Sequence, residues 1–294
     1  PQLMSEKKSS LVAPYIALMK LRVVELLLVT TLPALFLAAN GVPSASVTAA
    51  TLIGGTLAAG ASNAFNMIIE VDSDRLMNRT SKRPLVTGEI SEQAAFIFAS
   101  VLTILSLTIL KVFTNTLATV LTAAAIVFYV LGYTIGLKRR TSQNIVWGGI
   151  AGCMPVLIGW AAVADRLSLT AWLFFILIFF WTPPHFWALA IKYKDDYAAA
   201  GIPMLPVVAS MKSVEKQMWF HTIGMTLASL GVNYTAHLPW WCWLITVLLA
   251  GGFIQQLLRI NRADGAKAAA KLFQWSITYL SVYSLLLVVA VLLK

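Results

Sequence analysis

The sequence predicts an all-α protein, a polytopic membrane bundle of about nine transmembrane helices. Of its 294 residues, 59% are hydrophobic and only 12% are charged, which is too little charge to cover a water-soluble domain of this size. The apolar residues also form long uncharged runs, as in 94–110, 142–164 and 281–293. A bilayer core of about 30 Å needs about 20 such residues per helix, and a backbone in lipid must satisfy its own hydrogen bonds.

Nine segments are long and apolar enough to be spans, and together they are expected to form one domain over 1–294. They are 22–40, 46–69, 93–111, 116–137, 143–163, 169–191, 217–236, 239–258 and 272–293. The first is the weakest, because Glu25 lies near its start. Cys153 and Cys242 lie in apolar segments, so neither a structural disulfide nor a metal motif is expected from them.

Basic residues fall almost entirely on one side of these spans, which receives 19 of the 22 lysine and arginine residues. By the positive-inside rule, we expect this side to be the cytoplasmic face of a bacterial inner membrane, or the matrix face in an organelle. It carries the N-terminal segment with Lys7 and Lys8 and the two long loops, 71–92 and 192–216. The net charge of +10 is interpreted as a topology signal and a contact with anionic membrane lipid, with no nucleic-acid partner.

Three polar residues lie at the end of the second span, each four residues after the last: Asn66, Glu70 and Asp74. On a helix, each step of four advances about 40° beyond a full turn, so all three share one face. Asp72 lies between them and projects elsewhere if the helix continues, or turns inward if the chain leaves the helix. Amide and carboxylate oxygens suit a hard cation such as Mg²⁺, which leaves its other positions to phosphate and water.

Basic residues follow this acidic face directly. They are Arg75, Arg79, Lys82 and Arg83. This pattern suits a diphosphate. The carboxylates can hold a metal, and the guanidinium and ammonium groups that follow can hold phosphate oxygens. The competing interpretation is that these are ordinary loop charges at the end of a membrane helix.

The second long loop repeats the arrangement of span, acid and base in a weaker form. It follows Pro183–Pro184 and His185 and carries Lys192, Lys194, Asp195, Asp196 and Tyr197. The likeness between the two loops suggests two distant copies of one unit, although the sequence signal for this repeat is weak. Long polar loops on one face of a bundle are where function is expected to lie.

Two stretches resemble the UbiA-type intramembrane prenyltransferases. The first, NMIIEVDSDRLMNRTSKRPL at 66–85, is similar to the family's first signature, with Glu70 where most members have Asp. The second, PPHFWALAIKYKDDYAAAGIPMLPV at 183–207, departs from the usual pair of Asp residues four apart, because Lys192 stands four positions before Asp196. Both stretches resemble the same branch, which farnesylates protoheme IX to give heme O.

The resemblance implies farnesyl diphosphate as donor, protoheme IX as acceptor and Mg²⁺ as cofactor. Asn66, Glu70 and Asp74 would hold the metal and act in catalysis. Substrate-binding roles would fall to Asp72, Arg75, Arg79, Lys82, Arg83, His185, Lys192, Lys194, Asp195, Asp196 and Tyr197. Downstream proteins of heme A synthesis or of terminal oxidase assembly are expected as further partners.

Histidine is scarce, and two residues are candidates to meet a heme. His185 could contact the iron, a propionate or an ordered water, although a single histidine in a helical bundle is more often a hydrogen-bonded packing residue. His221, in the seventh predicted span, is the alternative axial ligand.

Two other functions remain open at this point. One is prenylation of a different acceptor, such as a quinone precursor or a chlorophyll-like ring; the unusual aspartate pattern of the second loop argues against it. The other is a transporter, which would place its polar residues near the middle of the membrane, whereas these acids cluster at one boundary.

Overall fold

The prediction of an all-α fold is confirmed in the computed structural model, which describes residues 12–262 and 265–294. The segment with Lys7 and Lys8 lies outside these residues. Eight helical segments of the described chain are long and apolar enough to cross a membrane. They are α2 (Leu21–Ala39), α3 (Ala45–Ile69), α6 (Glu92–Phe113), α7 with η1 (Thr116–Val127 and Phe128–Leu137), α8 with α9 (Asn144–Gly148 and Ile150–Ala164), α10 (Leu169–Lys192), α14 (Trp240–Leu257) and α15 (Gly265–Leu292).

The remaining predicted span, 217–236, lies within α13 (Met211–Thr235), which packs against α10 and α14. Helix α13 is long enough to cross a membrane, but it is not among the eight helices that are also apolar enough. The reason is that α13 carries polar residues that its neighbours satisfy. Asn233 donates a hydrogen bond to Thr246 of α14 at 2.9 Å and accepts one from Tyr283 of α15 at 3.0 Å. Such interhelical contacts replace the hydrophobic effect as a source of stability in lipid.

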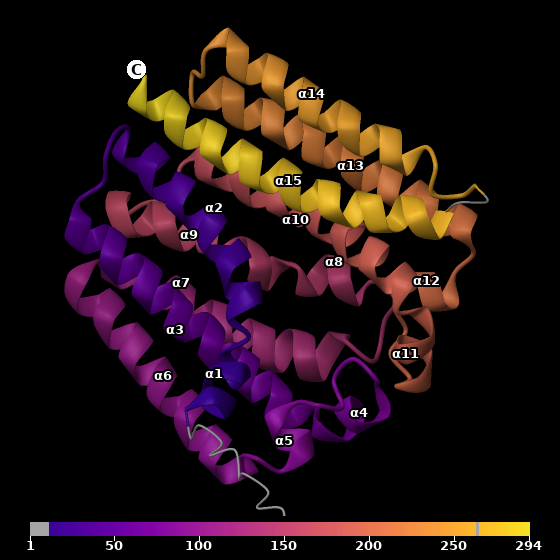
Figure 1. Ribbon diagram of the computed structural model, residues 1–294. Helices are drawn as coiled ribbons and strands as arrows, with labels where there is room; N and C mark the ends of the chain where they lie inside the picture. The colour runs from indigo at the N-terminus through magenta and orange to yellow at the C-terminus, as the bar shows by residue number, and fades with distance from the viewer. Residues whose placement is uncertain (1–11, 263–264) are drawn as a thin grey trace, which may run out of the picture.

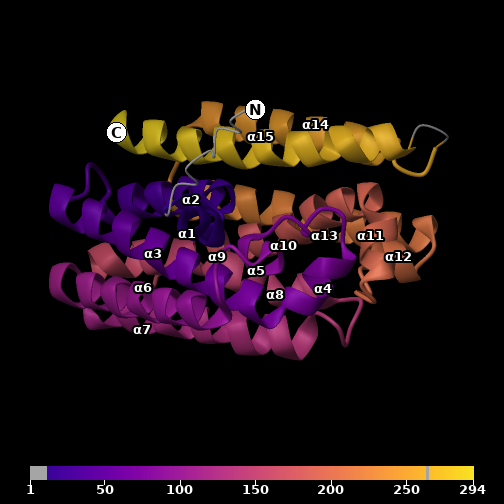
Figure 2. The ribbon, with the colours of Figure 1, turned by 60° about the horizontal axis from the view of Figure 1, so that its bottom comes forward.

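The long helices form a closed ring. Each packs against the next in the order α2, α3, α6, α7, α9, α10, α13, α14 and α15, and α15 returns to pack against α2. Figure 2 shows α14 and α15 along one edge of the bundle and α6 and α7 along the opposite edge. Helix α2 also packs directly against α9, and α10 against α15.

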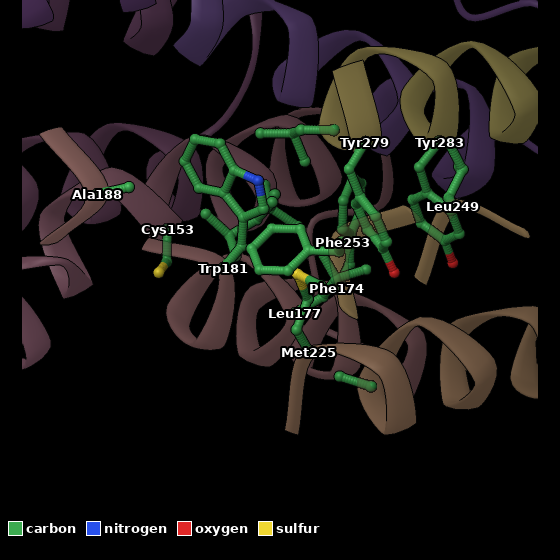
Figure 3. Close-up of a cluster of buried hydrophobic side chains, with 14 of the residues drawn as sticks. Cys153, Phe174, Leu177, Trp181, Ala188, Met225, Leu249, Phe253, Tyr279 and Tyr283 are labelled. Carbon is green, nitrogen blue, oxygen red and sulfur yellow. The ribbon is translucent and has the colours of Figure 1, made fainter. Parts of the chain in front are cut away.

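The largest packed core lies between α10, α13, α14 and α15. Figure 3 shows its aromatic side chains, among them Trp181, Phe174 and Tyr279, pointing toward one another from these helices. Two of these side chains have hydrogen-bond partners: Trp181 Nε1 donates to the Ser276 carbonyl at 2.8 Å, and the Tyr279 and Ser229 hydroxyls lie 2.7 Å apart. This half of the bundle is a solid support for the cavity described below.

Close helix approach on the other side of the ring uses small residues. Gly54 of α3 faces Leu110 of α6, where an added Cβ would come within 2.8 Å of the leucine side chain. Ser106 of α6 donates a hydrogen bond to the Gly54 carbonyl at 2.6 Å. Small residues at such contacts let membrane helices approach closely, which fixes α3 against α6.

Four short helices gather at one end of the bundle. They are α4 (Val71–Leu76), α5 (Pro84–Thr87), α11 (Lys194–Ala199) and α12 (Leu205–Val208), and both views place them together (Figures 1 and 2). They belong to the two loops predicted to lie on the basic side. The C-terminus lies at the opposite end, where Lys294 Nζ donates to the Ala236 carbonyl at 2.6 Å. Both cysteines are free and buried.

Candidate active site

The polar face of α3 opens into the interior of the ring. Helix α3 ends at Ile69, and α4 begins at Val71, so the chain bends at Glu70. Asn66, Glu70 and Asp74 are each no more than 4% exposed and all line one cavity. The step of four thus places the three side chains together, as the spacing predicted.

Each of these polar groups is bound by a basic side chain from another part of the chain or from the following loop. Lys20 Nζ donates to Asn66 Oδ1 at 3.0 Å. Lys138 Nζ lies 2.5 Å from Glu70 Oε1, and Arg83 Nη1 lies 2.5 Å from Asp74 Oδ2. Because the cluster is buried, these contacts compensate charges that would otherwise be costly at a membrane boundary.

Basic charge exceeds acidic charge at this end of the cavity. Its lining includes two carboxylates, Glu70 and Asp74, and four basic side chains: Lys20, Arg79, Arg83 and Lys138. Burial would raise the pKa of Glu70, but Lys138, with Lys20 and Arg83, outweighs burial and holds that pKa below its usual value. Burial, then repulsion from Arg83 and Lys138, lowers the pKa of Lys20 well below its usual value. The site therefore suits the binding of a multiply charged anion.

Lys138 reaches Glu70 because the fourth span changes its helical pitch. From Phe128 the chain is π-helical, and the Lys138 backbone N–H bonds to the Tyr133 carbonyl five residues earlier at 2.9 Å. The Tyr129 and Tyr133 rings of this segment lie 5.6 Å apart and line the cavity beside Glu70. π-Helical geometry is frequent at functional sites, and this ten-residue stretch brings a base and two aromatic faces to the acids.

Below the charged end, the cavity is apolar. It has a volume of about 350 Å³ and is lined from α2, α3, α7, α9 and α10. Hydroxyls in its wall bond back to their own helices: Thr51 to the Val47 carbonyl at 2.7 Å and Thr122 to the Ala118 carbonyl at 2.8 Å. The wall therefore offers few free proton donors, and it suits a hydrocarbon chain.

The second loop contacts the first. Asp196 accepts hydrogen bonds from the Asn78 side chain and from the Arg79 backbone N–H, each at 3.2 Å. Arg79 lies over the rings of Tyr193 and Tyr197, and Tyr197 lines the cavity. The two loops predicted to carry function thus meet at Arg79.

Several predicted site residues lie away from the cavity. They are exposed and do not form part of its lining: Asp72, Arg75, Lys82, Lys192, Lys194 and Asp195. Asp72 projects outward, the first of the two orientations considered, and pairs with Arg75 at 3.3 Å. Lys192 lies over the Tyr193 ring at 5.3 Å.

His185 occupies a packing position. It is stacked between Trp181 and Phe273, with centroid distances of 4.3 and 4.6 Å, and its Nδ1 lies 2.6 Å from Ser276 Oγ. It does not line the cavity, so the structure favours the packing role for His185 over contact with a heme. His221 is also outside the lining; it stacks on Trp187 with centroids 5.3 Å apart.

Sequence reasoning missed Lys20 and Lys138 as site residues. Lys138 was interpreted only as a topology signal, and Lys20 likewise. The available signal was position: each adjoins a span at the same membrane boundary as Glu70. Position alone does not show which lysines face inward, because that depends on how spans distant in sequence pack against one another.

The oxygen donors of Asn66, Glu70 and Asp74 suit Mg²⁺. Within 12–262 and 265–294, no group of three or more His, Cys, Asp or Glu side chains could hold a metal ion. Protein side chains alone thus do not supply all the ligands of the metal. This is usual for Mg²⁺ that is bound together with substrate phosphates. Since each donor is held by a base, a metal–diphosphate would take the carboxylates while its phosphate oxygens take the bases.

Lys138→Met is expected to destabilise the protein by about 3 kcal/mol at pH 7, because it leaves a buried carboxylate without its closest partner. The folded-state pKa of Glu70 is lowered, so its contribution is complete above about pH 4.3 and is lost as pH falls through the lower folded value. In the variant that pKa moves upward, and the penalty shrinks toward pH 4. Thermal unfolding in detergent, followed by circular dichroism, measures both effects. Arg139→Met, at an exposed neighbour, is the control, and equal midpoints for all three proteins at pH 7 would refute the ion pair's role.

The fold and the site define a class of membrane protein. The model of the UbiA prenyltransferase family matches residues 27–278, so the chain belongs to this family and is an integral membrane prenyltransferase. Among solved structures, a digeranylgeranylglyceryl phosphate synthase has a TM-score of 0.76 at 16% identity, covering 97% of this chain and 99% of its own. A UbiA homolog from Archaeoglobus fulgidus bound to DMAPP and Mg²⁺ has a TM-score of 0.70 at 19% identity, covering 94% and 99%.

More similar relatives carry one particular name. A protein from Streptomyces avermitilis named protoheme IX farnesyltransferase is 47% identical over 281 residues, which cover 92% of this chain and 91% of that protein. A protein of the same name from Streptomyces coelicolor is 45% identical over 285 residues, covering 95% and 90%. The resemblance seen in the two loops therefore extends over almost the whole chain.

Proposed function

We propose that the chain transfers a farnesyl group from farnesyl diphosphate to a vinyl group of protoheme IX, with addition of water, to give heme O. The observation that carries the proposal is a single buried cavity with two unlike parts. One end has a surplus of basic over acidic side chains, and the rest is apolar. A molecule with an anionic head and a hydrocarbon tail fits this cavity, with its head at the basic end and its tail in the apolar part. The acceptor follows from the relatives' names and from the likeness of both loops.

Diphosphate departure is the first step of the proposed reaction. Asn66, Glu70 and Asp74 would hold Mg²⁺, which would neutralise part of the leaving group's charge. Lys20, Arg83 and Lys138 stabilise the same oxygens as negative charge develops on them. The bond between the farnesyl carbon and the diphosphate oxygen breaks, and both electrons leave with the diphosphate.

The allylic cation that remains is held in the apolar part, beside the faces of Tyr129 and Tyr133. The electron pair of the heme vinyl group forms the new carbon–carbon bond. Positive charge then lies on the vinyl carbon beside the porphyrin ring, where the oxygen of a water molecule adds. Loss of one proton from that water gives the hydroxyl group and balances the reaction.

The proposed setting is a bacterial inner membrane, with the two loops on the cytoplasmic face and 1–294 acting as one domain. Farnesyl diphosphate has a water-soluble head, so a head-binding end at the cytoplasmic boundary suits its delivery. The product is more apolar than protoheme and stays in the membrane. Proteins of heme A synthesis or of terminal oxidase assembly are the corresponding downstream partners.

Purified protein incubated with protoheme, Mg²⁺ and farnesyl diphosphate should yield a heme whose mass has gained one farnesyl group and one water. Mass spectrometry of the extracted heme measures this product, and released diphosphate is measured in the same reaction. A quinone precursor offered in place of protoheme is the acceptor control. Prenylation of that control with an unchanged heme would overturn the acceptor, and substrate uptake without diphosphate release would favour a transporter.

A further inference from the structure

Asp196 links the second long loop (192–216) to the first (71–92). Its Oδ1 accepts a hydrogen bond from Asn78 Nδ2, and its Oδ2 accepts one from the backbone N–H of Arg79, each at 3.2 Å. Both carboxylate oxygens are thus engaged by the segment between α4 and α5. Asp195, one position earlier, is exposed. Two adjacent aspartates therefore have different surroundings.

Arg79 is held at its side chain as well as at its backbone. Its guanidinium lies 5.7 Å from the centroid of the Tyr193 ring and 5.8 Å from that of Tyr197. Its Nη2 donates to the Tyr197 hydroxyl at 3.5 Å. Arg79 lines the cavity together with Glu70 and Asp74. The first turn of α11 and the residue before it thus hold one arginine at the charged end of the cavity.

A metal role for Asp196 does not fit these contacts. Asp196 is absent from the lining of the cavity that Asn66, Glu70 and Asp74 share. Lys192 stands four residues before it, where a second carboxylate would be needed. Asp196 instead links the two loops, because its carboxylate accepts two hydrogen bonds from the first loop. We call this pair of hydrogen bonds the tie; the charge of the carboxylate makes them stronger than bonds between neutral groups.

We propose that Asp196 is a positioning residue that holds Arg79 ready for the diphosphate of the donor, rather than a metal ligand. The proposal rests on the proposed function to the extent that a prenyl diphosphate is the anion bound. An arginine that is already ordered loses less conformational freedom when the donor binds. Removal of the tie therefore weakens donor binding, while the reaction of the bound donor changes little.

The first experiment measures farnesyl diphosphate binding to the whole protein by calorimetry, with Mg²⁺ and without protoheme. We expect Asp196→Ala to raise the dissociation constant about tenfold and Asp196→Asn, which keeps a neutral acceptor, to raise it less. Asn78→Ala should also raise it, and Asp195→Ala should not. The Mg²⁺ concentration for half-maximal binding should stay that of the parent protein. A tenfold rise of that concentration in both Asp196 variants, with Asn78→Ala unaffected, would overturn the proposal in favour of a metal ligand.

The second experiment follows amide hydrogen exchange of the substrate-free protein. Because Asp196 accepts a bond from the Arg79 N–H, peptides containing Arg79 should exchange faster in Asp196→Ala and at the parental rate in Asp195→Ala. Parental exchange in Asp196→Ala would refute the tie directly. Neither experiment uses an acceptor, so a failure to form heme O would leave both results standing.

Discussion

Asp74→Ala is expected to reduce product formation by roughly 100- to 1,000-fold, the loss seen when a group that stabilises transition-state charge is removed. Asp74 is buried, shares the cavity with Asn66 and Glu70, and pairs with Arg83 at 2.5 Å. Without it the proposed metal loses one of two carboxylates, and diphosphate departs with less of its charge neutralised. The heme mass assay described above measures the effect.

Asp72→Ala is the matched control, because Asp72 lies two residues away on the same short helix but is exposed and outside the cavity. It should keep parental activity. Removal of Asp74 leaves Arg83 without its partner, so Asp74→Asn, which still accepts a hydrogen bond from Arg83, tests the charge separately from the fold. Normal heme O formation by Asp74→Asn and Asp74→Ala would remove the metal assignment.

Gly55→Phe is expected to shift donor preference from farnesyl diphosphate to a shorter prenyl diphosphate. Gly55 of α3 lines the cavity, and a Cβ built there has no neighbouring atom within 4 Å. It lies eleven residues before Asn66, about 16 Å along the helix. A ring at this depth occupies the end of the tail groove, so kcat/KM for the farnesyl donor should fall roughly 10- to 100-fold, from the 1–3 kcal/mol typical of overpacking.

Competition between farnesyl and geranyl diphosphate, read as the ratio of the two product masses, measures this shift. Gly251→Phe is the control: a Cβ there also meets nothing within 4 Å, but Gly251 is exposed on α14 and lies outside the cavity. An unchanged ratio in Gly55→Phe, in a protein that still binds donor, would show that the tail lies elsewhere.

The spans were predictable because hydrophobic runs and capping residues act locally. The second span was expected over 46–69 and is α3, Ala45–Ile69, which begins after Ser44, whose side chain accepts a hydrogen bond from the Val47 N–H. The predicted span 217–236 lies within α13, although this helix is less apolar than the other spans because neighbouring helices satisfy its polar residues. The π-helical stretch from Phe128 also leaves no periodic signal, since an apolar run looks the same at either pitch.

The candidate site was predictable only where its residues share one segment. Asn66, Glu70 and Asp74 follow from spacing on a single helix. Lys138 and Lys20 do not, because they reach the acids through the packing of separate spans. For Asp195 and Asp196 the sequence offered two equivalent acids, and only the contact with the first loop distinguishes them. The roles of these residues remain predictions until the variants are measured.

The closure of α15 against α2 has a consequence for biosynthesis. The cavity wall draws on residues from Lys20 to Leu280, so nearly the whole chain must be made before the wall is complete. Arg79 emerges from the ribosome 117 residues ahead of Asp196, about 6 to 23 s at ordinary translation rates. During that interval the nascent chain has the acidic face without its enclosure. An incomplete chain therefore lacks the enclosed cavity in which the proposed transfer would take place.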